Sequence, residues 1–341
     1  MKFDEEKKRS IIFYILEKIN QGEPSVTKTV SEVFSVNQNT IHTYINSLVR
    51  DNIIERIKRG QYKLVSNEFV YEIKRSAGDL DNDTYAYSKC LHSHIENLES
   101  NVQQIWSYTF SEMINNVMDH SEAEKTEIVI EQDYLKTTAI ISDNGIGIFN
   151  KIKSHFGFET VEDVICELFK GKLTTDTVNH SGEGIFFSSK MMDDFFIVSS
   201  GKIFSNNKYD NSRIIDIAAE NQKGTSVIMS LSNFTHKIPG EIFDLYANVD
   251  GGFTKTRIPM KNIFDTAPVS RSQAKRVSNR LEKFKEVIID FDNVQWMGQG
   301  FAHQLFVVFN NEHPDIKIMP VSMNEDVTKM YNHVMNTEIQ S

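Results

Sequence analysis

Glu112, Asn116 and Asp143 are the residues whose types and spacing best suit chemistry on a phosphorylated ligand. Glu112 and Asn116 stand four residues apart in FSEMINNVMDHS (110–121), so on a helix a carboxylate and a carboxamide share one face. That pair suits a magnesium ion and an attacking water. Asp143 follows an apolar strand pattern in ISDNGIGI (141–148), where it can accept a hydrogen bond from an exocyclic amine. Together these segments predict a nucleotide pocket.

Two glycine turns accompany these side chains. Gly145 and Gly147 follow Asp143 closely, and Gly182 and Gly184 lie in HSGEGIFF (180–187). Glycine lets the main chain approach a ligand, and successive backbone amides in such turns can cradle phosphate. The segment GKLTTDTVNHSGEG (171–184) is rich in Thr, Asn and Gly, which suits a lid over a ligand.

Other phosphate-binding motifs fail on inspection. A P-loop around Gly171-Lys172 would need glycine at Cys166 and a hydroxyl at Leu173. Neither glycine pair completes G-x-G-x-x-G, because Asn150 and Phe187 occupy the last position. P-loop and Rossmann sites are therefore disfavoured.

In this order the segments resemble the N, G1 and G2 boxes of the GHKL ATPase superfamily. That superfamily includes gyrase-type topoisomerases, heat-shock chaperone ATPases, histidine kinases and anti-sigma-factor kinases. Gly224-Thr225, which opens the apolar strand GTSVIMSL, also falls in the family's order. The resemblance implies a Bergerat-type α/β sandwich that binds ATP with Mg2+.

The resemblance also implies a role for each residue. Asp143 would bind the adenine amine with help from Thr225, and Asn116 would ligate magnesium. Glu112 would be the general base, because a base must reach the attacking water. The turns that would shape the lid and the phosphate site are those of Gly145, Gly147, Gly182 and Gly184.

Three other positions are ambiguous. Lys172 would either reach a phosphate or be a solvated surface charge. His120, one turn beyond Asn116, is expected to be structural. In Cys90-x-His92-x-His94 only Cys90 and His94 share a helix face, and with no second ligand pair nearby we do not expect a zinc site.

Residues 1–68 predict three short helices, at 9–19, 27–34 and 40–50, and then two short strands in IIERIKRGQYKLV around a turn at Arg59-Gly60. This order resembles a winged helix-turn-helix domain, whose third helix enters the major groove of duplex DNA. Polar side chains there can bond base edges, and wing cations can bond phosphates. The expected DNA contacts are Asn37, Gln38, Asn39, Thr40, Thr43, Asn46, Arg56, Lys58 and Arg59.

Charge weakens the DNA prediction without excluding it. Residues 1–70 carry eleven Lys or Arg and nine Asp or Glu, whereas the whole chain carries 37 and 47, so the net charge of -10 arises in the rest of the chain. A winged helix used for protein contact or dimerisation stays open. The chain has two cysteines and no apolar run near 18 residues, and its first residues, MKFDEEKKRS, lack an apolar signal segment. We expect a cytoplasmic protein without membrane contact.

Residues 253–335 alternate between strand and helix patterns, which predicts a small α/β domain. The pattern resembles the STAS-like domains of unknown function found behind GHKL ATPases, and the anti-sigma-factor antagonists. Antagonists accept phosphate on a serine where this chain has Met297-Gly298-Gln299-Gly300, and no Ser or Thr occurs between Lys285 and Val321. We expect this domain to contact the ATPase core, a second protomer or a partner protein, with Trp296, Met297 and Phe301 as apolar candidates.

The predicted order is therefore an α/β multidomain protein. A winged helix (1–68), a linker (69–84), a GHKL α/β sandwich (85–235), a linker (236–252) and a STAS-like domain (253–335) follow one another. The expected function is an ATP-controlled DNA-binding regulator. The alternative is a serine/threonine protein kinase of the anti-sigma type that acts on a separate partner.

Overall fold

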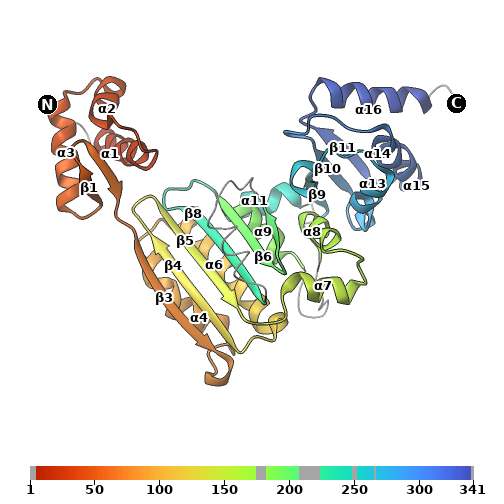
Figure 1. Ribbon diagram of the computed structural model, residues 1–341, viewed down its shortest axis with the longest axis horizontal. Helices are drawn as coiled ribbons and strands as arrows, with labels where there is room; N and C mark the ends of the chain where they lie inside the picture. Colours follow the sequence, from red (N-terminus) through yellow and green to blue (C-terminus); the bar gives the residue numbers. More distant parts are fainter. Residues whose placement is uncertain (1–4, 174–181, 207–222, 248–251, 265, 339–341) are drawn as a thin grey trace.

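The computed structural model describes residues 5–173, 182–206, 223–247, 252–264 and 266–338. Three regions follow one another along the chain (Figure 1): a small helical region at the N-terminus, a central six-stranded sheet, and a C-terminal region with its own sheet. Within this part of the chain, none of the helices combines the length and the apolar character that a membrane span requires.

The N-terminal region consists of three helices and a hairpin. These are α1 (Glu5–Asn20), α2 (Val26–Phe34), α3 (Gln38–Arg50), β1 (Ile54–Lys58) and β2 (Gln61–Leu64). Apolar residues one helical turn apart, such as Ile11 and Ile15 on α1 and Ile41 and Ile45 on α3, are fully buried in a core that belongs to this region. The helical spacing seen in the sequence therefore produces a separate hydrophobic core.

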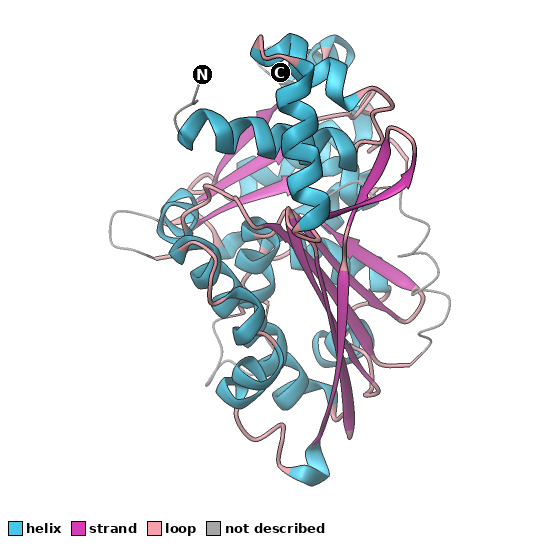
Figure 2. Ribbon diagram, turned by 90° about the vertical axis from the view of Figure 1, so that its left-hand side faces the viewer, coloured by secondary structure: helices cyan, strands magenta, loops and turns pink. Residues whose placement is uncertain are grey.

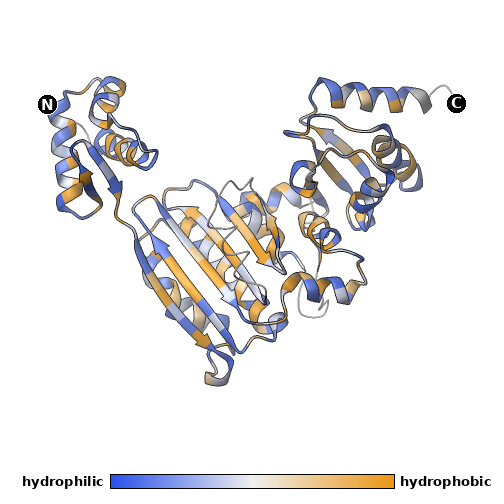
Figure 3. Ribbon diagram, in the orientation of Figure 1, coloured by the Kyte–Doolittle hydropathy of each residue, from blue (hydrophilic) through white to orange (hydrophobic). Residues whose placement is uncertain are grey.

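The central sheet is antiparallel throughout, in the order β3-β4-β5-β8-β6-β7. Its strands are β3 (Asn67–Lys74), β4 (Lys125–Gln132), β5 (Lys136–Asp143), β6 (Asp194–Ser199), β7 (Lys202–Ser205) and β8 (Thr225–Ser232). Helices lie on one face of this sheet (Figure 2), and apolar residues concentrate in its inner strands (Figure 3). They include α4 (Asp83–Cys90), α5 (His92–Ile95), α6 (Ser100–Asn116) and α9 (Gly184–Met191).

Strand β3 corrects the linker that we expected at residues 69–84. It pairs with β4 over its full length, from Asn67 opposite Gln132 to Lys74 opposite Lys125. Ile73 is buried and Tyr71 is half-buried, whereas Val70, Glu72 and Lys74 are exposed, so this part of the strand alternates as a strand with one buried face does. The acidic stretch AGDLDND that suggested a linker occupies only the turn that follows.

The second expected linker, 236–252, also contains regular structure. Helix α11 (Pro239–Tyr246) begins with proline, whose fixed φ suits the first turn. Its Phe243 packs on Phe187 and its Tyr246 on Phe186, at ring separations of 4.5 and 4.9 Å. Aromatic packing therefore holds this segment against α9.

The C-terminal region has a parallel sheet in the order β11-β10-β9, formed by β9 (Lys255–Pro259), β10 (Glu286–Asp290) and β11 (Lys317–Val321). Its helical segments are α12 (Met260–Ile263), α13 (Arg271–Ser278), η3 (Leu281–Lys283), α14 (Gln299–Ala302), η4 (His303–Phe309), α15 (Asn310–Glu312) and α16 (Glu325–Glu338). Met297 and Phe301, expected as contact residues, lie in its core, whereas Trp296 is 52% exposed.

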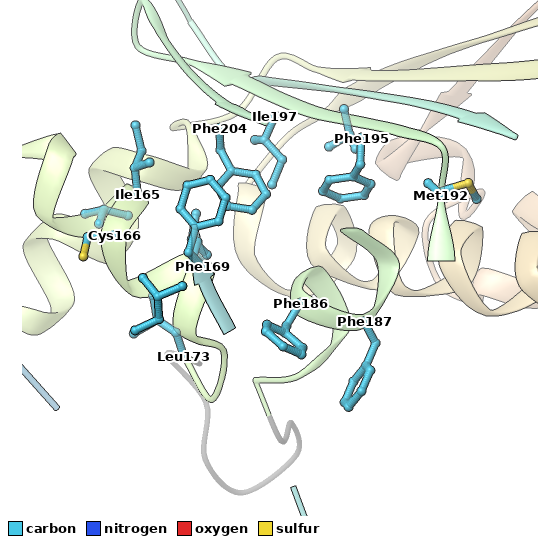
Figure 4. Packing of buried hydrophobic residues seen from close by; sticks show 14 of the residues in the cluster. Ile165, Cys166, Phe169, Leu173, Phe186, Phe187, Met192, Phe195, Ile197 and Phe204 are labelled. Carbon is cyan, nitrogen blue, oxygen red and sulfur yellow. The ribbon is translucent and has the colours of Figure 1, made fainter. Parts of the chain in front are cut away.

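Helices α7 (Ile148–Phe156) and α8 (Val161–Lys170) connect the central sheet to the C-terminal region. A single hydrophobic cluster runs from the central sheet through α8 and α9 into the C-terminal sheet. Figure 4 shows part of it, where Phe169 near the end of α8 lies against Phe204. The central and C-terminal regions therefore share one core.

Candidate functional site

A pocket lies between helix α6 and the ends of strands β5 and β8. It is a partly open depression whose empty space, counted together with open solvent, is about 390 Å³. It brings together Asn116, Asp143 and Thr225, three of the residues predicted from sequence to bind one ligand. The complete lining is Met113, Asn116, Val117, His120, Ser121, Asp143, Ile148, Ile185, Ile197, Thr225 and Val227.

Asp143 and Thr225 are neighbours because β5 and β8 pair in antiparallel register at this row. Asp143 is 6% exposed, and its Oδ1 accepts the Gly145 N–H at 2.8 Å. Thr225 Oγ1 accepts the Ile148 N–H at 2.9 Å, which fixes the first turn of α7. Burial raises the pKa of the Asp143 carboxyl, and hydrogen bonds from Gly145 and Thr225 oppose that rise.

The glycine after Asp143 is required by the fold. A Cβ at Gly145 would lie 2.0 Å from the Ser121 carbonyl oxygen, a distance that no side chain tolerates. The adjacent Ile146 N–H donates to that same oxygen at 2.9 Å. The turn that carries Asp143 is therefore fastened to the end of the α6 helix, and Gly147, with a φ of +82°, completes it.

That helix end is a π-helical turn, η2 (Val117–Ser121), which continues α6 directly after Asn116. Such turns widen a helix locally and are frequent at functional sites. The turn is closed by the Ser121 hydroxyl, which donates to the Val117 carbonyl at 2.6 Å. It places His120 and Ser121 in the pocket lining.

His120 and Ser121 are therefore pocket residues that sequence reasoning missed. His120 was expected to be structural, one helical turn beyond Asn116. A regular helix already places His120, four residues after Asn116, on the same face, whereas Ser121 would point away from that face and lies in the lining because the helix ends in a π-helical turn. The signal available in the sequence was their closeness to Asn116 in the same segment.

Glu112 lies one turn before Asn116 on α6, outside the pocket lining and against the start of α9. A Cβ at Gly184 would meet Glu112 Oε2 at 2.0 Å. Only glycine therefore lets the carboxylate lie directly against the first residue of α9. Gly182 has a φ of +73° and its carbonyl accepts the Leu173 N–H at 3.2 Å. The expected lid (171–184) is described only at 171–173 and 182–184.

Lys172 does not line this pocket. Its ammonium donates to the Lys283 carbonyl at 3.1 Å and lies over the rings of Phe253 and Phe284, at 5.4 and 5.1 Å from their centres. The attraction of a cation to aromatic faces directs the side chain toward the C-terminal region. The expected contact with phosphate is therefore not supported by its position.

The residues expected to contact DNA lie at and in α3 and in the hairpin β1–β2. Of the expected contact residues on α3, Gln38, Asn39, Thr43 and Asn46 are exposed and Thr40 is half-buried. Asn37 caps α3 by accepting the Asn39 N–H at 2.8 Å, so its carboxamide oxygen is already used. Lys58 and Arg59 are exposed at the hairpin, and the Arg56 guanidinium stacks on Tyr62 at 5.5 Å.

Comparison with known families identifies one part of the chain. Residues 273–328 match the STAS-like domain of unknown function (DUF4325). The match begins in α13 and ends in α16, so it covers most of the C-terminal region. A comparison with curated proteins finds no match.

Proposed function

We propose that the central region is a GHKL-type ATP-binding module and that the protein is an ATP-controlled DNA-binding regulator. The pocket around Asp143 is the main support for ATP binding by the central region. A buried carboxylate and the Asn116 carboxamide line this pocket together with apolar side chains. A pocket with apolar walls and a few convergent polar groups is the usual form of a small-molecule site.

The chemistry of the lining favours an adenine base. Met113, Ile148, Ile185 and Val227 supply apolar surface against which a flat ring can pack. The Asp143 carboxylate can accept a hydrogen bond from the exocyclic amine of adenine. Guanine carries a carbonyl oxygen at the corresponding ring position, which a carboxylate repels. ATP is therefore the expected ligand, and GTP should bind more weakly.

Asn116 fits a magnesium ion that arrives with the phosphates. Among the described residues no three His, Cys, Asp or Glu side chains are grouped so that they could hold a metal ion. Mg2+ commonly takes one or two protein oxygens and completes its shell with phosphates and water. Bound in this way, the ion would neutralise phosphate charge next to Asn116.

Glu112 is the proposed general base for hydrolysis. Its carboxylate lies one helical turn from Asn116 and against Gly184, where α9 begins. An acceptor at that place can take a proton from a water near the terminal phosphate of a nucleotide whose base lies against Asp143. Gly145, Gly147, Gly182 and Gly184 are the proposed phosphate and lid turns.

The DNA-binding part of the proposal depends on α3 and the hairpin β1–β2. Gln38, Asn39, Thr43 and Asn46 project amides and hydroxyls from one helix, and the hairpin carries Lys58 and Arg59. Base edges are read by such polar groups, and phosphates are bound by such cations. ATP would control DNA binding if the closed and open states of the pocket hold the N-terminal region differently.

Titration calorimetry with Mg-ATP tests the pocket. We expect Asp143→Ala to weaken ATP binding about tenfold or more, since a buried hydrogen-bonding group left unpaired costs about 1 to 3 kcal/mol. Thr235→Ala, which removes a hydroxyl outside the pocket lining, is the matched control. Equal ATP affinity in wild type and Asp143→Ala would overturn the assignment.

A further inference from the structure

The end of α8 is where the STAS-like region meets the central region. Lys170, the last residue of α8, is fully buried. Its ammonium donates to the Glu167 carboxylate, to the Arg276 carbonyl at 3.1 Å and to the Asn279 carbonyl at 2.6 Å. The two carbonyls lie at the C-terminal end of α13, where a helix leaves such groups without partners. A buried cation of one region therefore caps a helix of the other.

The two residues after Lys170 are held by the same region. Gly171 has a φ of +83°, and a Cβ there would lie 2.8 Å from the Phe253 ring. Lys172 and Lys283 bind each other reciprocally, because each ammonium donates to the other's carbonyl, at 3.1 and 3.3 Å. The Thr256 hydroxyl on β9 donates to the Lys170 carbonyl at 2.8 Å. Three consecutive residues are thus each attached to the C-terminal region.

Two ion pairs give this joint a defined geometry. Asp163 on α8 binds Arg276 at 2.6 Å, and Glu167 binds Arg280 at 3.4 Å. The side chains of Glu167 and Lys170 are 4% and 1% exposed. Buried charges are tolerated only when each one keeps its partners. A shift of α13 along α8 would leave Lys170 and Glu167 without theirs, so the joint resists small displacements.

The same stretch of chain leads to the candidate site. The Leu173 N–H donates to the Gly182 carbonyl at 3.2 Å, just before α9 begins. The first residue of α9, Gly184, lies against the Glu112 carboxylate, and the second, Ile185, lines the pocket. A displacement of Lys172 and Leu173 would therefore shift the start of α9, which contacts Glu112 and contributes Ile185 to the pocket lining.

We propose that Lys170 and Lys172 are positioning residues of the ATP site and that the STAS-like region acts through them as a built-in effector of nucleotide binding. This inference rests on the proposed ATP-binding function. Coupling between two sites is reciprocal. ATP should therefore stabilise the end of α13, and a change at the joint should alter ATP affinity without removing any residue from the pocket.

Hydrogen exchange on the full-length wild-type protein tests the first half. We expect saturating Mg-ATP to slow amide exchange in residues 271–284, which form α13 and η3, by several-fold. Helix α16, at the far end of the C-terminal region (Figure 1), is the internal control and should exchange at the same rate with and without ATP. Unchanged exchange in residues 271–284, in protein shown by calorimetry to be saturated with ATP, would overturn the coupling.

Substitutions at the joint test the second half. Lys170→Met and Lys172→Met keep most of the side-chain volume but remove the ammonium, and we expect each to weaken ATP binding about threefold to tenfold, within the range of coupling through a packed joint. Lys275→Met, on the exposed side of α13, removes the same charge outside the joint and should bind ATP like wild type. Circular dichroism and thermal unfolding establish that each variant is folded.

The half-buried Lys172 keeps the inference testable if Lys170→Met does not fold. A folded Lys172→Met that binds ATP like wild type, and shows wild-type ATP-dependent protection of residues 271–284, would contradict the positioning role. A wild-type protein that binds no ATP would overturn the proposed function, and this inference with it. Retained ATP binding with no response at α13 would overturn this inference alone.

Discussion

The N-terminal and C-terminal regions join the central sheet in opposite ways. The N-terminal region has its own core, against which Leu135 of the central region packs, and Phe13 packs on Phe234 at 5.3 Å, with Tyr134 behind it at 5.5 Å. The C-terminal region instead shares the core of the central region and adds buried ion pairs. A narrow aromatic contact permits reorientation at modest cost, whereas a shared core and paired buried charges do not.

This difference in attachment implies that the N-terminal and C-terminal regions move differently relative to the central sheet. Only Val65 and Ser66 separate β2 from β3, the edge strand of the central sheet. We therefore expect the N-terminal region to reorient about this short connection. The C-terminal region should move with α8 and α9, and so with one wall of the pocket. Four experiments test this contrast.

The largest effect should come from Glu112→Gln, which changes the central region alone. We expect ATP hydrolysis to fall about a hundredfold to ten-thousandfold, because an amide cannot act as a general base. ATP binding should be retained, and DNA retention without ATP should match wild type. Release of inorganic phosphate measures ATP hydrolysis, and filter binding measures DNA retention. Wild-type hydrolysis in this variant would remove Glu112 from the mechanism.

A matched pair of aromatic substitutions compares the two joints directly. Phe253 is 7% exposed and packs on Phe186, Phe187 and Phe284, whereas Phe234 is 41% exposed. Phe253→Ala should lower the free energy of unfolding by about 3 to 5 kcal/mol, as truncation of a large core side chain usually does. Phe234→Ala should lower it by about 1 kcal/mol or less.

Urea unfolding of both variants under the same conditions measures these changes. Similar decreases in the two variants would break the contrast between a shared core and a narrow contact. A larger decrease in Phe234→Ala would reverse it.

Substitution of Arg56, Lys58 and Arg59 by alanine tests the proposed DNA binding of the N-terminal region. We expect weaker binding to duplex DNA and a shallower dependence of affinity on salt, by about one power of salt concentration for each cation removed from a phosphate. ATP affinity without DNA should not change. A wild-type protein that retains no DNA from a randomised pool, with and without ATP, would favour a protein-binding role for this region.

The smallest effect concerns the ionisation of Asp143. Burial raises the pKa of its carboxyl, so the folded protein binds that proton more tightly than the unfolded chain. Its stabilising contribution is then present at low pH and is lost as pH rises through the folded-state pKa. Asp143→Asn keeps an acceptor for the Gly145 N–H but cannot ionise, so without nucleotide it should be more stable than wild type at neutral pH.

Thermal unfolding across a pH series checks this sign. The advantage of Asp143→Asn should shrink as pH falls from the raised folded-state pKa to the ordinary carboxyl pKa of about 4, and it should stay constant below that pH. If the difference in stability between Asp143→Asn and wild type does not vary with pH, ionisation of Asp143 does not cause that difference.

Local patterns in the sequence identify much of the fold and part of the site. Helical spacing at Ile11 and Ile15 predicts α1, and the alternation before Asp143 predicts β5. The same reasoning misplaced a linker over β3, because the acidic stretch after Lys74 outweighed the alternation of Phe69, Tyr71 and Ile73. Composition is a weaker guide than periodicity where a strand lies at a sheet edge and keeps many polar residues.

The sequence alone determined those features that depend on residues close together in the chain. They are the spacing of Glu112 four residues before Asn116, the place of Asp143 at the end of a strand pattern, and the glycines where the chain must turn. Tertiary structure decided where Ser121, Lys170 and Lys172 lie. Lys172 binds a carbonyl 111 residues further along the chain, and Ser121 lies in the pocket lining at the end of a π-helical turn. Such placements depend on which distant segments pack together, and no local period encodes that.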